Sequence, residues 1–212
     1  MTRRARDRQV IAAARALTER GLVVGTAGNV SVRDGDRIRM TPTRTAYAGL
    51  RRSGLVTLDL DCEEPPPTAS LEWRLHVEIY RRRPEVRAVV HAHGPWSTAW
   101  SCHGEPLAPE LEEATYYGIG TVCTAPHAPA GSAELAERTA RTLGASGAVL
   151  LERHGLVAVG DTPDHALNIA QAVEHQAHVA WLVRGAGGPS AGGVVSQPRA
   201  KGPPATLLLP IS

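Results

Sequence analysis

The chain has 212 residues, and its 23 basic and 21 acidic residues leave a formal net charge of +2. This length suits one compact domain that buries most of its apolar surface. The near balance of charge creates no field that would attract a polyanion, so we expect no nucleic-acid partner. Arginine supplies 22 of the basic residues, and the one lysine, Lys201, lies in Gly/Pro-rich sequence. Catalysis through a lysine imine needs a desolvated lysine in a pocket, so we exclude it.

Further features indicate the compartment. No run of apolar residues approaches the roughly 18 that cross a bilayer, so we expect no membrane span. The first ten residues, MTRRARDRQV, are charged and do not resemble a secretory signal. The three cysteines (Cys62, Cys102 and Cys123) form no CxxC pair, which argues against a disulfide scaffold. Together these features predict a cytoplasmic protein.

Apolar periodicity and turn signals predict the secondary structure. In chain order we expect a helix over 3–20, strands over 30–33, 37–41 and 55–60, a helix over 71–83, a strand over 86–91, helices over 96–102 and 110–117, a strand over 121–123, a helix over 132–143, strands over 148–151 and 156–159, and a helix over 163–183. Strands and helices mix without strict βαβ alternation. We therefore expect an α/β fold, a three-layer α/β/α sandwich around a central mixed, largely antiparallel sheet. Residues 1–184 would form this domain, and residues 185–212 a flexible Gly/Pro-rich tail.

The most specific local motif is His91-Ala92-His93, at the end of a buried strand. Side chains two apart on a strand point to the same face, so the two imidazoles are placed side by side, as a zinc ion requires. His154 is the best candidate for a third ligand, because Gly155 after it permits a close backbone approach. Three histidines with an open fourth position are typical of catalytic zinc. In a chain with nine histidines such a pair also arises by chance, so spacing alone leaves the structural interpretation open.

Two other segments carry weaker signals. In Gly25-Thr-Ala-Gly-Asn-Val-Ser31, small residues let backbone amides converge on an anion, with Asn29 and Ser31 adding side-chain donors. The segment lacks the spacing of a nucleotide-binding P-loop. Thr41-Pro-Thr43 places two hydroxyl groups after the second strand. Each segment taken alone is more often a turn than a binding site.

Glu72 lies in the segment Ser70-Leu-Glu-Trp-Arg74, in the first turn of an expected helix. A carboxylate at that position usually caps the helix or interacts with its dipole. On the last expected helix, Asp164, Glu174 and Gln176 suggest that the neighbouring histidines lie on solvated faces. His76 has no obvious partner in the sequence.

Taken in order, the segments GTAGNVSVR, TPT, SLEWRLH, VVHAHGPWSTAWS and LERHGLVAVG resemble the class II aldolase/adducin-like family, in particular its fuculose-phosphate aldolase branch. The resemblance runs from about residue 5 to residue 183. It implies that His91, His93 and His154 bind one Zn²⁺ per subunit, and that Glu72 is the catalytic acid/base and can also approach the metal. It further implies a substrate phosphate site that includes Gly28, Asn29, Thr43 and Ser70. Family members usually form a cyclic homotetramer.

The reaction implied is the reversible cleavage of a ketose 1-phosphate, either L-fuculose-1-phosphate-like or a 5-deoxypentulose 1-phosphate, to dihydroxyacetone phosphate and an aldehyde. The enediolate left by C3–C4 cleavage needs charge stabilisation, which zinc supplies without a lysine imine. Alternatives with the same metal site are decarboxylation of a hydroxy acid, dehydration of methylthioribulose 1-phosphate and 4-epimerisation of a pentulose 5-phosphate. The adducin branch is structural, but the intact histidines and Glu72 argue against a non-enzyme.

Three departures from the family pattern leave the substrate open. Arg44 follows Thr43 where glycine is common, and Leu71 precedes Glu72 where a second phosphate-binding serine is common. A glutamate-rich loop replaces a loop whose tyrosine assists protonation; its glutamates are Glu110, Glu112 and Glu113. Arg44 could bind the phosphate through a bidentate contact, bind a substrate carboxylate, or simply face solvent in a turn. Both Arg44 and Leu71 therefore stand as candidate substrate-binding residues.

Overall fold

The computed structural model describes residues 2–187. Seven strands form one sheet in the order β3-β2-β1-β4-β7-β6-β5, and only the β5–β6 pair is parallel. The expected mixed, largely antiparallel sheet is confirmed. Its strands are β1 (Asn29–Asp34), β2 (Arg37–Met40), β3 (Val56–Asp59), β4 (Ala88–Ala92), β5 (Thr124–Ala125), β6 (Ala148–Leu151) and β7 (Gly155–Gly160).

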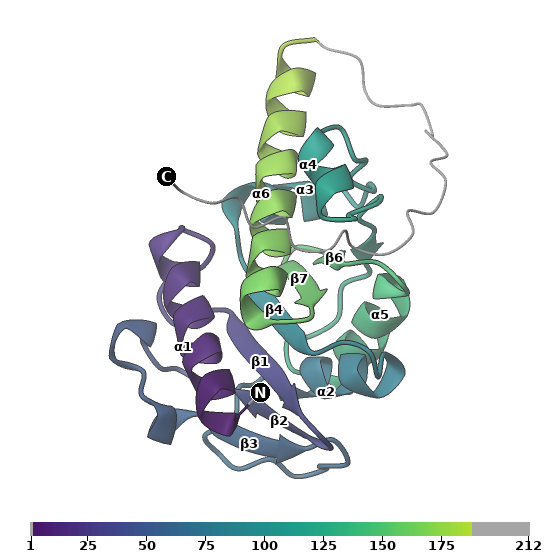
Figure 1. Ribbon diagram of the computed structural model, residues 1–212. Helices are drawn as coiled ribbons and strands as arrows, with labels where there is room; N and C mark the ends of the chain where they lie inside the picture. The colour runs from purple at the N-terminus through teal and green to yellow at the C-terminus, as the bar shows by residue number, and fades with distance from the viewer. Residues whose placement is uncertain (1, 188–212) are drawn as a thin grey trace, which may run out of the picture.

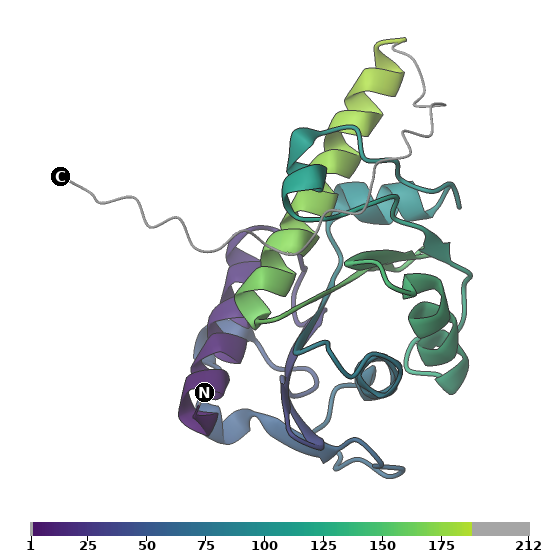
Figure 2. The ribbon, with the colours of Figure 1, turned by 45° about the vertical axis from the view of Figure 1, so that its right-hand side comes forward.

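Helices cover both faces of the sheet, as Figures 1 and 2 show. Helices α1, α3, α4 and α6 lie on one face, and α2 and α5 pack together on the other. The three expected layers are therefore present. The helices are α1 (Arg3–Glu19), α2 (Trp73–Arg82), α3 (Pro95–Ser101), α4 (Glu112–Tyr116), α5 (Ala133–Leu143) and α6 (Pro163–Gly185), and two 3-10 turns, Tyr47–Gly49 and Arg52–Gly54, link β2 to β3.

Alternation along the strands divides the core into two apolar layers. Val30 of β1 and Val90 of β4 face α1 and α6, whereas Val89 of β4 and Val157 of β7 face α2 and α5. The chain has no phenylalanine, and most of both layers consists of alanine, valine, leucine and isoleucine. His91 alternates with Val90 and therefore lies on the α2 side of the sheet. Asn29 is its cross-strand partner in β1.

One predicted strand is wrong. The pattern predicts a strand over 121–123, but the strand comes at Thr124–Ala125, where it runs parallel to β6. Val122 instead forms an isolated bridge with Leu107. An apolar run does not specify the strand with which it pairs. Here the residues that pair with β6 are Thr124 and Ala125, which follow the predicted run. The proposed domain boundary stays a prediction, since most of the 185–212 segment lies outside the described residues and α6 ends at Gly185.

No described helix combines the length and the apolar character that crossing a membrane requires. Within the described part, Cys62, Cys102 and Cys123 are free cysteines, and two of them are exposed.

Candidate active site

Three imidazoles from two chain segments meet at one point beside β4. His91 is the fourth residue of β4, and His93 follows the end of that strand. His154 lies in the turn between β6 and β7, where Arg153 adopts a left-handed φ of 57°. The ring centroids are 4.6 to 5.1 Å apart. The structure therefore brings together the three histidines that the spacing selected.

The carboxylate of Glu72 completes this cluster. Glu72 immediately precedes α2, and its Oε2 lies 3.1 Å from His91 Nε2 while its Oε1 lies 3.1 Å from His154 Nε2. One donor atom from each of the four residues lies within 4.8 Å of the others, a group that could hold a metal ion. Glu72 does not cap α2 with its side chain, so the capping interpretation is wrong.

The donor geometry of the four residues fits a cation. The Nε2 atoms of His91 and His93 are 2.8 Å apart, a separation that two lone pairs tolerate only with a proton or a cation between them. His91 Nδ1 lies 2.9 Å from the Leu156 carbonyl oxygen. That carbonyl requires a donor, so Nδ1 carries the hydrogen and Nε2 turns its lone pair toward the cluster, as in ligating histidines. The buried Glu72 Oε1 faces His154 Nε2 and has no other polar partner among the described residues.

The charges of the cluster are strongly coupled. Burial alone would raise the pKa of Glu72, but His91 and His154 hold this pKa well below its usual range. Burial alone would lower the pKa of His91, but the Glu72 carboxylate raises it. Burial and the other two imidazoles lower the pKa of His93 to about 3. The cluster therefore contains an ionised, buried carboxylate, whose negative charge needs a cationic group beside it.

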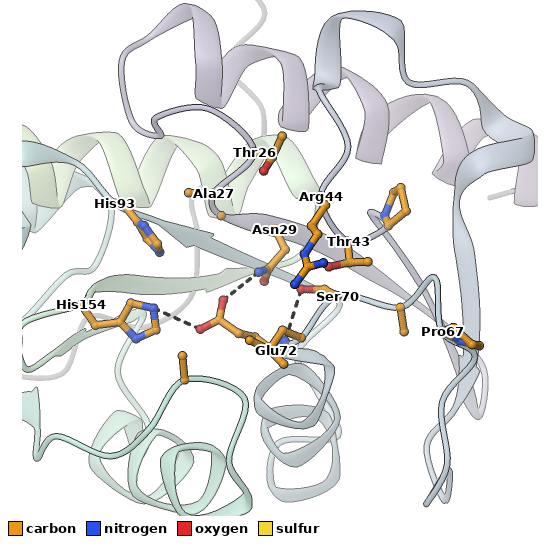
Figure 3. A pocket seen from close by; sticks show the side chains of 15 residues that line it. Thr26, Ala27, Asn29, Thr43, Arg44, Pro67, Ser70, Glu72, His93 and His154 are labelled. Carbon is orange, nitrogen blue, oxygen red and sulfur yellow. Dashed lines mark hydrogen bonds and ion pairs between the residues drawn. The ribbon is translucent and has the colours of Figure 1, made fainter.

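A cavity of about 500 Å³ opens beside this cluster. Its lining contains every residue predicted to bind the substrate, together with Glu72, His93 and His154. The predicted residues are Gly28, Asn29, Thr43, Arg44, Ser70 and Leu71. In Figure 3, Glu72 lies between the two histidines on one side and Arg44, Thr43 and Ser70 on the other. The cavity therefore has a cluster of imidazoles at one end, and hydroxyl groups and a guanidinium at the other.

Two backbone positions shape this cavity. Gly28 has a φ of 72°, and a Cβ there would lie 2.8 Å from the His91 carbonyl oxygen, so only glycine fits. Arg44 also has a left-handed φ, 49°, although it is not glycine. Such a conformation is uncommon for a residue with a side chain, and its occurrence at a ligand site is a typical sign of function.

The sequence-based account of the polar residues needs several corrections. Ser31 does not reach the cavity; it is fully buried and lies 2.7 Å from His76 Nδ1. Glu174 is buried, and its carboxylate accepts hydrogen bonds from the backbone amides of Trp96 and Ser97. Gln176 is also buried and donates to the Ala108 carbonyl group. The glutamates Glu110, Glu112 and Glu113 do not line the cavity.

His76 is the polar residue that sequence analysis missed. It is fully buried on α2 between Asn29 and Ser31. The signal is present in its spacing, because His76 stands four residues after Glu72 and four before Tyr80, so the three residues share one helix face.

Comparison with known proteins decides the family. The family model for the Class II Aldolase and Adducin N-terminal domain matches residues 8–181. The chain belongs to the class II aldolase and adducin family. Its relatives in this family are named aldolases, and the chain is accordingly a lyase of the class II aldolase type.

Relatives of known activity cover most of the chain. The 5-methylthioribulose-1-phosphate/5-deoxyribulose-1-phosphate aldolase of Rhodospirillum rubrum is 38% identical over 173 residues, which are 81% of this chain and 78% of that protein. The L-fuculose phosphate aldolase of Escherichia coli (strain K12) is 37% identical over 175 residues, 82% of this chain and 81% of the relative. The crystal structure of L-fuculose-1-phosphate aldolase from Thermus thermophilus superposes with a TM-score of 0.80 at 29% identity, and covers 90% of this chain and 100% of that one.

Proposed function

We propose that this class II aldolase is zinc-dependent and reversibly cleaves a ketose 1-phosphate, L-fuculose-1-phosphate-like or a 5-deoxypentulose 1-phosphate, to dihydroxyacetone phosphate and an aldehyde. The observation that supports the proposal is the convergence of three imidazoles on a buried carboxylate beside a cavity with an arginine and hydroxyl groups at its far end. The names of the relatives in Rhodospirillum rubrum and Escherichia coli support the same substrate class.

His91, His93, His154 and Glu72 are the proposed ligands of one Zn²⁺ per chain. Imidazole nitrogens and a carboxylate oxygen are ligands that zinc prefers, and three histidines are typical of a catalytic site. When bound, the ion would act as a Lewis acid that stabilises the negative charge left on the dihydroxyacetone phosphate half after C3–C4 cleavage. The lone lysine, Lys201, lies outside the described residues and has no part in this proposal.

Glu72 is the proposed acid/base. Asn29 Nδ2 donates a 2.9 Å hydrogen bond to Glu72 Oε2, whereas Oε1 faces only the His154 imidazole, at 3.1 Å. We therefore assign proton exchange to Oε1. In the cleavage direction the C4 hydroxyl group would lose its proton as the C3–C4 bond breaks and the aldehyde leaves, and Glu72 would deliver a proton to C3. In the synthetic direction Glu72 would take a proton from C3, and the C4 oxygen would gain one as the new bond forms.

The far end of the cavity is the proposed phosphate site. Gly28, Asn29, Thr43, Ser70 and Arg44 would hold the phosphate group so that the reacting carbons lie near Glu72. Leu71, next to Ser70, lines the same cavity, and 63% of its surface is exposed. It offers an apolar contact instead of a donor, which leaves Arg44 as the cationic group at this end of the cavity.

A substrate panel read by mass spectrometry tests the function. The panel contains ketose 1-phosphates (methylthioribulose 1-phosphate among them), pentulose 5-phosphates and non-phosphorylated hydroxy acids, each incubated with zinc-loaded protein and with chelated protein. We expect dihydroxyacetone phosphate only from ketose 1-phosphates and only with metal. Turnover of a hydroxy acid with loss of CO₂, and no cleavage of a ketose 1-phosphate, would replace the proposal with a decarboxylase. Full turnover by metal-free protein would refute the metal dependence.

We further propose a homotetramer and a cytoplasmic location. The tetramer rests on membership of the class II aldolase and adducin family, whose members usually form a cyclic homotetramer. Light scattering during size-exclusion chromatography would report about four times the 22.5 kDa chain mass. The proposed location rests on the three free cysteines, Cys62, Cys102 and Cys123.

A further inference from the structure

A continuous chain of buried polar side chains runs beneath Glu72. From the cavity inward it consists of Glu72, Asn29, His76, Ser31 and Tyr80, and each is at least nine-tenths buried. Glu72 Oε2 lies 2.9 Å from Asn29 Nδ2, and Asn29 Oδ1 hydrogen-bonds His76 Nε2. His76 Nδ1 lies 2.7 Å from Ser31 Oγ, which lies 2.9 Å from Tyr80 Oη.

The helical and strand periodicities together place these five side chains next to one another. Glu72, His76 and Tyr80 are four residues apart at the start of α2 and along it, so they share one helix face. Asn29 and Ser31 are two residues apart on β1 and point to the same side of the sheet. The two rows interlock, and His76 is placed between the two β1 side chains.

The first hydrogen bond in the chain runs from Asn29 to Glu72. Asn29 turns its Nδ2 toward Glu72 Oε2 and therefore its Oδ1 toward His76. Oδ1 only accepts, so His76 Nε2 must carry a hydrogen and donate it. Burial, followed by the charge of His91, lowers the pKa of His76 to about 3, so the ring is neutral at physiological pH.

The rest of the chain follows from the neutral ring. With its hydrogen on Nε2, His76 presents a lone pair at Nδ1, and Ser31 must donate its hydroxyl hydrogen there. Ser31 Oγ then accepts from the Tyr80 hydroxyl group. Burial raises the pKa of Tyr80 well above its ordinary value, so this hydroxyl keeps its hydrogen. One arrangement of protons therefore supplies a donor and an acceptor for every link of this chain.

We propose that His76, as its Nε2–H tautomer, is a positioning residue that fixes the orientation of the Asn29 amide and thereby holds Glu72 Oε2 while Oε1 is left to exchange protons. The part concerning proton exchange rests on the function proposed for Glu72. Without a donor from position 76, Asn29 is free to flip, and its Oδ1 would then face and repel the carboxylate. When a proton-transferring group loses its alignment, kcat falls by more than the affinity for the substrate does.

A pair of variants separates positioning from packing. In glutamine the amide nitrogen reaches about as far from Cβ as His76 Nε2, whereas in asparagine it reaches only about as far as Nδ1. We expect His76→Gln to keep kcat within about threefold of wild type and His76→Asn to lower kcat about 10- to 100-fold, with KM and metal content within about twofold. Val77→Ala, which removes buried α2 packing away from the polar chain, serves as the control, with a lower Tm and an unchanged kcat. Equal losses of kcat in the two His76 variants would overturn the positioning role.

The tautomer is tested in the wild-type protein without any substrate. Solid-state ¹³C–¹⁵N correlation spectra of zinc-loaded, histidine-labelled protein distinguish Nδ1 from Nε2, and the signal absent from His76→Gln identifies His76. We expect a neutral ring with its hydrogen on Nε2 from pH 6 to pH 8. A hydrogen on Nδ1 would overturn the proposal even if both variants failed to fold. This measurement is independent of the substrate panel, so failure of the aldolase assignment and failure of the His76 arrangement are separately visible.

Discussion

Gly155 packs directly against the backbone of Ala92. This contact holds the β6–β7 turn, which carries His154, close to the end of β4, which carries His91 and His93. A Cβ at position 155 would overlap the Ala92 carbonyl oxygen and lie 2.9 Å from His93 Cδ2. Gly155 pairs with Leu151 in the β6–β7 hairpin. The sequence predicts that Gly155 permits a close backbone approach, and this is confirmed: the backbones of β7 and β4 come close together at Gly155 and Ala92.

Gly155→Ala should separate His154 from the other two histidines. The added methyl group has no space, so the hairpin must shift, at a cost of about 1–3 kcal/mol in the free energy of unfolding. We expect metal affinity to fall at the same time, measured by competition with a chelating dye. Gly147→Ala is the matched control, because the nearest atom to its Cβ is a flexible side-chain carbon of Ile169 at 3.7 Å. Wild-type metal affinity in Gly155→Ala would show that the Ala92 contact does not set the position of His154.

Glu72→Gln should keep the metal and lose the reaction. Three histidines remain as ligands, and the glutamine carbonyl oxygen can still accept from Asn29, but an amide is not a base. We expect kcat to fall by about 10²- to 10⁴-fold, the range for loss of a general acid/base, with near-stoichiometric metal by elemental analysis. Glu85→Gln, whose carboxylate is exposed and paired with Arg83, should behave as wild type. Near-normal turnover by Glu72→Gln would assign proton transfer to another group.

The lowered pKa of His76 predicts that the free energy of unfolding decreases as the pH falls. This pKa is lowered from 6.5 to about 3 in the folded protein, so between these values the unfolded chain binds a proton that the folded chain does not. The stability contributed by neutral His76 is therefore fully present above pH 6.5 and is lost as pH falls, with a limiting slope of about 1.4 kcal/mol per pH unit. Urea unfolding of chelated protein between pH 4 and pH 7 measures this slope.

His76→Gln is the matched comparison for that slope, because it removes the titrating group and retains a donor to Asn29. Glu72 and His91 are the charged groups that act on His76, and both are present in the two proteins. We expect the variant to lose less stability on acidification than wild type, by up to about 1.4 kcal/mol for each pH unit. Identical slopes would mean that His76 is protonated in the folded protein or unprotonated in both states.

Sequence patterns predict the secondary structure and those site residues whose placement depends on local spacing. His91 and His93 share a face because they are two apart on a strand, and the helix and strand order follows from apolar periodicity. The substrate-binding candidates come from a resemblance that compares whole motifs, and they meet in one cavity because β1, β2 and α2 converge there. For these parts of the fold and the site, local spacing and the order of the motifs are sufficient.

Long-range pairings of polar groups are not predictable in this way. Glu174 and Ser97 are 77 residues apart, yet the carboxylate accepts from the Ser97 backbone amide and hydroxyl group at the start of α3. On α6 alone Glu174 looks like a solvated residue, because its partners lie on another helix. The same contact explains Gly94, where a Cβ would overlap the Glu174 carboxylate. His76 was missed for the same reason, since its partners Asn29 and Ser31 both lie on β1.

Arg44→Ala tests which group the cavity binds. Arg44 holds a left-handed φ at the end of the cavity that carries the Thr43 and Ser70 hydroxyl groups, and a guanidinium there can contact two phosphate oxygens at once. Removing it should raise KM for a ketose 1-phosphate by about 10- to 100-fold, the equivalent of about 1.5–3 kcal/mol for a charged hydrogen bond, with little change in kcat. Arg51→Ala, which removes an exposed arginine outside this cavity, is the control. A selective loss of binding to carboxylate substrates would instead identify Arg44 as a carboxylate ligand, and no change for either class would leave it a turn residue that faces solvent.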